Sequence, residues 1–219
     1  MRFVSGLLLT CLLVLPVSAI AEEDVTKEDV VAKEWRFNLM MDGSPIGSQV
    51  FRLSREGQRS RVSVAADFDV KILFLSVYTY EHRNEELWEG GCLLAMNSTT
   101  DDNGEVFRVT ASSVADGLLV ETRDGRKSLA GCVHSFAYWD PKQLGSSRLL
   151  NPQTGEYEAV RIKEHGTETI PFRGQPTTAR RISLEGDKLK INLWYSDTSD
   201  WLALESTTKS GRKLYYQRQ

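Results

Sequence analysis

Hydrophobic and polar residues alternate over long stretches of this chain. The clearest stretch is residues 61–72, where every even position is apolar: Val62, Val64, Ala66, Phe68, Val70 and Ile72. The odd positions between them are charged or small. A period of two is typical of a strand that buries one face in a core and turns the other toward water. The pattern therefore predicts a strand over residues 61–72.

Turn signals recur at short intervals and divide the chain into many such strands. They stand at 42–43, 56–57, 103–104, 116–117, 124–125, 154–155, 186–187 and 210–211. The Asp-Gly and Asn-Gly pairs among them supply the positive φ that tight hairpin turns require. About a dozen strands joined in this way predict an antiparallel meander, and the twist of so long a sheet makes it curl. We expect an all-β fold with minor helix, shaped as a barrel or half-barrel, with a sandwich as the alternative.

Two short helices are expected beside the strands. The first covers residues 26–33, with Thr26 as its N-cap. The second lies near residues 140–145, where Asp140 can act as N-cap and Pro141 suits the first helical position. This second helix would break the meander near its middle. Because no internal repeat or linker divides the chain, residues 22–219 are expected to form a single domain.

Residues 1–21 have the pattern of a secretory signal peptide. Arg2 precedes a nearly unbroken apolar run, and Ala19-Ile20-Ala21 is a cleavage site of the A-x-A type. The run is short for a membrane span, which needs about 20 residues, although an uncleaved anchor is the alternative. We therefore expect a periplasmic or secreted protein that is cleaved after Ala21 and then does not span the membrane.

Composition and charge exclude several classes of protein. The chain has 219 residues, of which 41% are hydrophobic and 26% charged, and its formal net charge is −3. These values exclude disordered and collagen-like chains and argue against a nucleic-acid partner. Beyond the leader only Cys92 and Cys132 remain, and an even number of cysteines in an exported chain predicts a disulfide. Two buried free thiols are the alternative.

Residues that could carry out chemistry are few. His82, His134 and His165 lack the spacing of metal ligands, and the nucleophile motif G-x-S-x-G is absent from the sequence. His134 is close in sequence to Ser135 and Asp140, but neighbours on a strand point to opposite faces. The glutamates at 81, 85, 86 and 89 indicate a solvated loop beside Trp88. We therefore predict no catalytic residue, cofactor or metal, and a hydrolase-type enzyme using His134 is the least favoured of three hypotheses.

Apolar and aromatic residues favour a binding function. The run at residues 72–75 is apolar on both faces, which predicts a strand buried on both sides or the wall of an apolar cavity. Trp88 and Trp194 add large rings, and Trp194 falls on the polar face of its strand. The candidate ligand-binding residues are Ile72, Phe74, Trp88 and Trp194. The first hypothesis is a non-catalytic protein that binds or carries an apolar or lipid-like ligand. The second is an envelope interaction or structural module with a filled core and a protein partner.

From Trp88 onward the sequence resembles a family of exported bacterial β-rich proteins of unknown function. The motifs that carry the resemblance are Gly91-Cys92-Leu93-Leu94, Asp102-Asn103-Gly104, Tyr138-Trp139-Asp140, the run at 149–155, Leu193-Trp194-Tyr195, and the run at 201–205 followed by Gly211 and Tyr215. The C-terminal pattern is also similar to that of periplasmic lipoprotein-carrier half-barrels. The resemblance implies a curled antiparallel sheet around an apolar cavity and a lipid-like ligand. It transfers no catalytic residue.

Overall fold

The computed structural model describes residues 31–72, 74–187, 189–208 and 211–219. The predicted signal peptide, residues 1–21, lies outside this part of the chain, as do residues 26–30 of the predicted first helix. The remaining residues of that helix, 31–33, belong to a strand, so this part of the prediction is wrong. They pair with the neighbouring strand through Val31↔Ser54 and Lys33↔Leu53.

Thirteen of the described strands form one antiparallel sheet. Its first eight strands are β1 (Val31–Met41), β2 (Ser44–Glu56), β3 (Arg59–Ile72), β4 (Leu75–Glu89), β5 (Cys92–Asp102), β6 (Glu105–Val114), β7 (Gly117–Thr122) and β8 (Gly125–Ala130). The other five are β11 (Arg161–Phe172), β12 (Gln175–Glu185), β13 (Lys190–Tyr195), β14 (Trp201–Thr207) and β15 (Lys213–Arg218). The prediction of an all-β antiparallel meander is confirmed.

The predicted turns position these strands. At the β5–β6 turn Asn103 and Gly104 both adopt positive φ, 55° and 91°, and at the β1–β2 turn Asp42 and Gly43 do the same, with 48° and 84°. Two positive φ values in succession are what a tight hairpin needs to match the twist of its strands. Within β3, Val62, Val64, Ala66 and Val70 are buried, as the alternation predicts.

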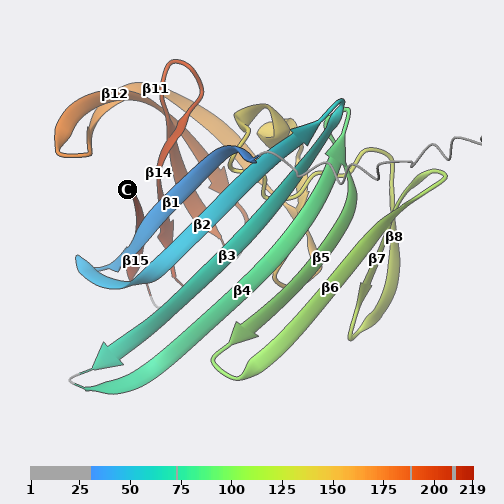
Figure 1. Ribbon diagram of the computed structural model, residues 1–219, viewed down its shortest axis with the longest axis horizontal. Coiled ribbons are helices and arrows are strands. Elements are labelled where there is room, and N and C mark those ends of the chain that lie inside the picture. The colour runs from blue at the N-terminus through green and yellow to red at the C-terminus, as the bar shows by residue number, and fades with distance from the viewer. Residues whose placement is uncertain (1–30, 73, 188, 209–210) are drawn as a thin grey trace, which may run out of the picture.

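The sheet consists of two meanders, β1–β8 and β11–β15, joined by the pairing of β15 with β1. It curls strongly, so that β11–β14 face the middle of the first meander across an interior (Figure 1). Strands β8 and β11 stand at the two ends of the strand order, and no pairing between them closes the sheet within the described residues. The curled sheet is therefore barrel-like but open.

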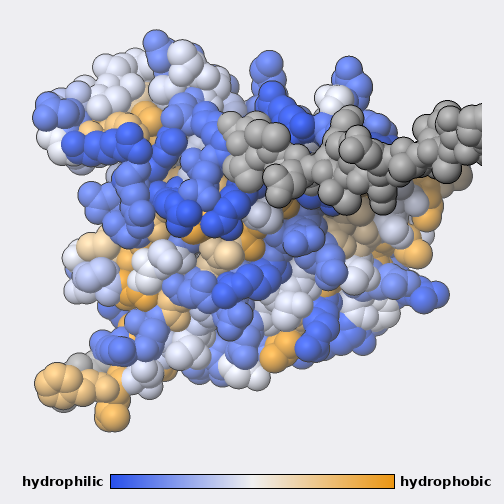
Figure 2. All heavy atoms as spheres, viewed as in Figure 1, coloured by the Kyte–Doolittle hydropathy of each residue, from blue (hydrophilic) through white to orange (hydrophobic). Residues whose placement is uncertain are grey.

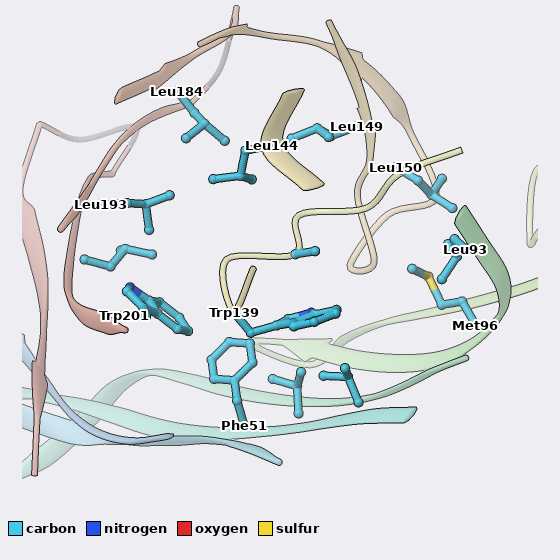
Figure 3. Close-up of a cluster of buried hydrophobic side chains, with 14 of the residues drawn as sticks. Phe51, Leu93, Met96, Trp139, Leu144, Leu149, Leu150, Leu184, Leu193 and Trp201 are labelled. Atoms are coloured by element: carbon cyan, nitrogen blue, oxygen red, sulfur yellow. The ribbon is translucent and has the colours of Figure 1, made fainter. Parts of the chain in front are cut away.

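The segment between β8 and β11, residues 131–160, enters the interior of the curl, and we call it the plug. It contains the 3-10 turn η1 (Pro141–Gly145) and the short paired strands β9 (Arg148–Leu150) and β10 (Tyr157–Ala159). The predicted second helix is thus a 3-10 turn, and Asp140 caps it by accepting a hydrogen bond from Lys142 N at 3.0 Å. Figure 3 shows the plug side chains inside the curl: Trp139, Leu144, Leu149 and Leu150. Most of the interior is therefore filled by the chain itself.

The plug is attached to two opposite parts of the curled sheet, β5 and β13. A disulfide joins Cys132 at the start of the plug to Cys92 at the start of β5, with a Cα–Cα distance of 5.1 Å. The next residues continue this attachment, because Leu93 N donates to Val133 O at 2.9 Å. On the opposite wall, the Tyr195 hydroxyl donates to Tyr138 O at 2.8 Å.

The apolar run at residues 72–75 lies at the tip of the β3–β4 hairpin. Phe74 is 96% exposed and Leu75 is 73% exposed, so the expectation of a buried strand or cavity wall is wrong for these two residues. Figure 2 shows the corresponding apolar tip, which projects from a mostly polar face. The hairpin extends beyond the end of the neighbouring β5–β6 hairpin (Figure 1), so its tip has no neighbouring strand to pack against.

Candidate functional site

Strand β4 carries an unusual buried face. Its inward positions are Tyr80, His82, Asn84, Glu86 and Trp88, all of them buried, while Glu81, Arg83 and Glu85 between them are exposed. The prediction of a solvated loop here is wrong: the segment is a strand, and Glu86 is only 5% exposed. Polar side chains on a buried strand face need partners inside the protein.

Glu86 receives hydrogen bonds from three side chains. Asn84 Nδ2 and Ser135 Oγ donate to Oε1 at 3.0 and 2.8 Å, and Trp88 Nε1 donates to Oε2 at 2.8 Å. Removal from water raises the pKa of the Glu86 carboxyl, and these donors oppose the rise by favouring its charged form. Because Ser135 belongs to the plug, this network also joins the plug to β4.

His82 lies on the same face of β4, two inward positions before Glu86. Its Nδ1 is 2.9 Å from Thr100 Oγ1 of β5. Burial, with a smaller contribution from the charge of Arg83, lowers the pKa of His82 to about 4. The imidazole is therefore neutral at pH 7 and can act as one hydrogen-bond donor and one acceptor.

A pocket of about 220 Å³ lies between this face and the plug, and we call it the interior pocket. Its polar lining comes from Gln49 of β2, from His82, Asn84 and Glu86 of β4, and from Asn151 and Gln153 of the plug. Its apolar lining comes from Phe51, Val62 and Val64 of β2 and β3, and from Leu189 and Ile191 at β13 on the far wall. Plug residues, among them Tyr138 and Trp139, form another side. Strands far apart in the sequence therefore meet around one space.

Two lining residues have buried polar atoms without a hydrogen-bond partner among the described residues. These atoms are the amide oxygen Oδ1 of Asn84 and the indole nitrogen Nε1 of Trp139. One is an acceptor and the other a donor. Both residues are more than nine-tenths buried. Such groups are uncommon in folded proteins.

The four predicted ligand-binding residues do not come together. Ile72 ends β3, and its side chain is outside the description; Phe74 is at the exposed hairpin tip. Trp88 packs edge-to-face on Trp139, with ring centroids 5.8 Å apart, and so supports one side of the interior pocket without lining it.

Trp194 belongs to a different environment. It faces away from the main core and packs in a separate cluster with Ile170 and Leu202. Its indole Nε1 donates to Glu168 Oε1 at 2.6 Å. This arrangement is a packing role on the outer side of β13, remote from the lining of the interior pocket.

The residues of the hypothetical His134 enzyme have separate roles. Ser135 is fully buried and donates to Glu86, and Asp140 caps η1. His134 Nε2 lies 4.0 Å from Cys132 Sγ of the disulfide, and burial lowers the pKa of its ring. These contacts do not connect a nucleophile to a base and the base to an orienting acid, as a catalytic triad requires.

The described residues contain neither a cluster of metal ligands nor a membrane-spanning helix. No three or more His, Cys, Asp or Glu side chains in this part of the chain are grouped to hold a metal ion. Within the same residues no helix has the length and apolar character needed to cross a membrane.

A signal for the β4 face is present in the sequence. The set Tyr80, His82, Asn84, Glu86 and Trp88 has an aromatic residue at each end and a period of two throughout. The alternate set begins with Glu81, Arg83 and Glu85, which are all charged. The uncharged aromatics mark which set is buried, and His82, Asn84 and Glu86 of this set line the interior pocket.

Comparison with known proteins supports the fold and gives no activity. A β-barrel-like protein of the domain of unknown function DUF1849 from Brucella abortus has a similar structure, with a TM-score of 0.64 and 8% sequence identity. The similarity covers 85% of this chain and 94% of that one. A search of the curated proteins finds no match. Residues 37–219 match a domain of unknown function, DUF6134, and the chain therefore belongs to the DUF6134 family.

Proposed function

We propose that this protein is an exported, non-catalytic binding protein that holds a small, partly apolar ligand in its interior pocket. The observation that carries the proposal is the pocket itself, whose lining combines apolar side chains from opposite walls of the curled sheet, such as Phe51, Val64 and Ile191, with the polar face of β4. Pockets that combine apolar walls with a few fixed polar groups are typical of small-molecule sites. The signal peptide predicted at residues 1–21 supports a periplasmic or secreted location.

The filled interior limits the size of the ligand. A volume of about 220 Å³ is below the roughly 300–1,000 Å³ that is typical of pockets for drug-sized ligands. The space suits a short chain or a single ring and does not suit a whole long acyl chain while Trp139, Leu144 and Leu149 occupy the interior. Within the proposed lipid-like class we therefore favour short amphiphiles.

The test is a titration with six-carbon amphiphiles, followed through amide signals in two-dimensional NMR spectra. We expect saturable shifts at residues 82–86 and at the Trp139 indole. Val64→Trp should fill the pocket and abolish the shifts, whereas Val106→Trp, at a 39% exposed site on β6, should retain them. Circular dichroism of both variants checks that they fold. If no amphiphile gives saturable shifts in the wild-type protein, the proposal is wrong.

A second candidate function is an envelope interaction module that binds a protein partner. The apolar β3–β4 tip favours it, because Phe74 and Leu75 are exposed far more than large apolar residues usually are. In this function Phe74→Ser with Leu75→Ser should abolish crosslinking to the partner, and Val64→Trp should not. The reverse result favours the interior pocket.

A further inference from the structure

We propose that the tip of the β3–β4 hairpin inserts into the surface of a lipid bilayer with zwitterionic head groups and so binds the protein reversibly to membranes. The proposal goes beyond the interior pocket and does not depend on it. It is carried by the exposed side chains of Phe74, Leu75 and Val77, by the strand pairing behind them and by the charges at the base of the hairpin.

The exposed apolar side chains gather at one end of the molecule. Phe74, Leu75 and Val77 are 96%, 73% and 47% exposed, and Val106 of the adjacent β5–β6 hairpin is 39% exposed. Among the described residues only one other large apolar side chain is exposed, that of Val114 at the opposite end of β6. Figure 2 shows the tip as an apolar projection from a mostly polar face. A grouping of this kind marks a surface that binds another apolar surface.

The backbone of the hairpin suits shallow insertion. β3 and β4 remain paired as far as Lys71↔Ser76 and Ile72↔Leu75, so the backbone groups that face each other across the hairpin are satisfied within it, as entry into lipid requires. The outer edges of the hairpin stay unpaired there and limit insertion to the hydrated interface. Ser76, the first polar residue after Phe74, is two residues and therefore about 7 Å along the strand. This length matches the roughly 5–10 Å that interfacial segments enter.

The charges behind the tip favour a bilayer without net charge. The nearest ionic groups cancel, because Lys71 Nζ lies 3.3 Å from Asp69 Oδ2. Further back, Arg83 Nη2 is shared between Asp67 and Glu81, at 2.6 and 3.2 Å. Residues 67–83 contain two basic and three acidic residues, whereas binding to anionic lipids uses clusters of about four to eight lysines and arginines.

A lipid surface fits the tip better than a protein partner does. A stable protein interface buries roughly 800 Å² on each partner. An aromatic side chain such as Phe74 supplies about 150–250 Å² of this, and Leu75 and Val77 are smaller, so the tip is too small for such an interface. Binding to a bilayer has no such minimum, because it scales with the apolar area inserted. The protein partner of the second candidate function is therefore an alternative outcome of the test.

The test is flotation with vesicles of phosphatidylcholine, alone or in an equimolar mixture with phosphatidylglycerol. The protein is purified after export, so that the apolar run within residues 1–21 does not itself bind the vesicles. We expect the wild type to float with phosphatidylcholine and no more strongly with the mixture. Phe74→Ser with Leu75→Ser should lower the partition constant about hundredfold or more. Val77→Ser and Val114→Ser are a matched pair, since both valines are 47% exposed, and only Val77→Ser should weaken binding.

The alternative results overturn the proposal in different ways. If the wild type does not float with phosphatidylcholine, or if the double-serine variant floats equally well, the tip does not insert into lipid. Stronger binding to the mixture overturns the choice of head group. Tip-dependent crosslinking to a protein without vesicle binding assigns the tip to the second candidate function. Val64→Trp, which fills the interior pocket, should float like the wild type; if it does not float, the pocket captures the lipid, which overturns this proposal and supports the proposed function. Circular dichroism checks that each variant folds.

Discussion

Replacing His82 with glutamine should remove much of the acid sensitivity of this protein. His82 is buried on β4, where its Nδ1 is paired with Thr100 Oγ1, and its pKa falls from 6.5 to about 4 on folding. Between these two values the unfolded chain binds a proton that the folded protein does not bind. The free energy of unfolding therefore rises with pH in this window and falls as the solution is acidified through it.

The size of the effect follows from the two pKa values. Because the pKa of His82 changes from 6.5 to about 4 on folding, its contribution to the free energy of unfolding falls by about 2 kcal/mol between pH 7 and pH 5. Glu86 acts in the opposite sense, because its raised pKa lets the folded protein retain a proton above the usual range. It is present in both the wild type and the variant, so its contribution cancels in the difference between them.

The assay is urea unfolding of wild type and His82→Gln at pH 7, 6 and 5. Whatever the substitution costs at pH 7, the advantage of the wild type should shrink by about 2 kcal/mol at pH 5. NMR titration of the His82 ring protons gives the folded pKa independently. An advantage that stays constant over the three pH values, or a ring that titrates near 6.5, would refute the reasoning.

Two other predictions concern the attachment of the plug and the packing of the sheet. Replacing Cys92 and Cys132 together by serine should lower the free energy of unfolding by about 4 kcal/mol, since the disulfide closes a loop with a sequence separation of 40; unchanged urea unfolding would contradict this. Gly47→Ala should destabilise the protein by roughly 2 kcal/mol or more, because a Cβ there would lie 2.1 Å from Asp67 O of the paired strand β3. The control Gly145→Ala, with no atom within 4 Å of the added Cβ, should leave the unfolding midpoint nearly unchanged, and equal effects of the two substitutions would count against the packing argument.

Local patterns in the sequence were sufficient to predict the antiparallel sheet. The alternation at residues 61–72 and the Asn103-Gly104 turn depend on neighbours in sequence, and both agree with the structure. The disulfide follows from the cysteine count, and the cap at Asp140 follows from a residue type next to a proline. The strand, the turn and the cap depend on interactions within one hairpin or one turn. The disulfide could be predicted because only two cysteines remain after the predicted signal peptide.

The interior pocket depends on interactions between distant segments, and here sequence reasoning failed. Glu86 is polar in any window of the sequence, and only the donors from Ser135 and Trp88 make its burial tolerable. The apolar run ending in Phe74 shows the opposite error, because apolar residues are not confined to the interior. The plug has no clear period, so its place inside the curl depends on how the whole sheet bends.

The open seam between β8 and β11 has a mechanical consequence. In a closed barrel, strand number and stagger fix the radius, and widening the barrel breaks hydrogen bonds. Here the sheet is open, because β8 and β11 do not pair with each other within the described residues. These two edge strands could therefore separate without breaking any hydrogen bond between paired strands. The width of the interior is instead fixed by the plug. The plug is joined to β5 by the disulfide at Cys132 and to β13 by the hydrogen bond from the Tyr195 hydroxyl. Widening of the sheet would therefore be resisted by these attachments and by the packing of Trp139, Leu144 and Leu149 in the core.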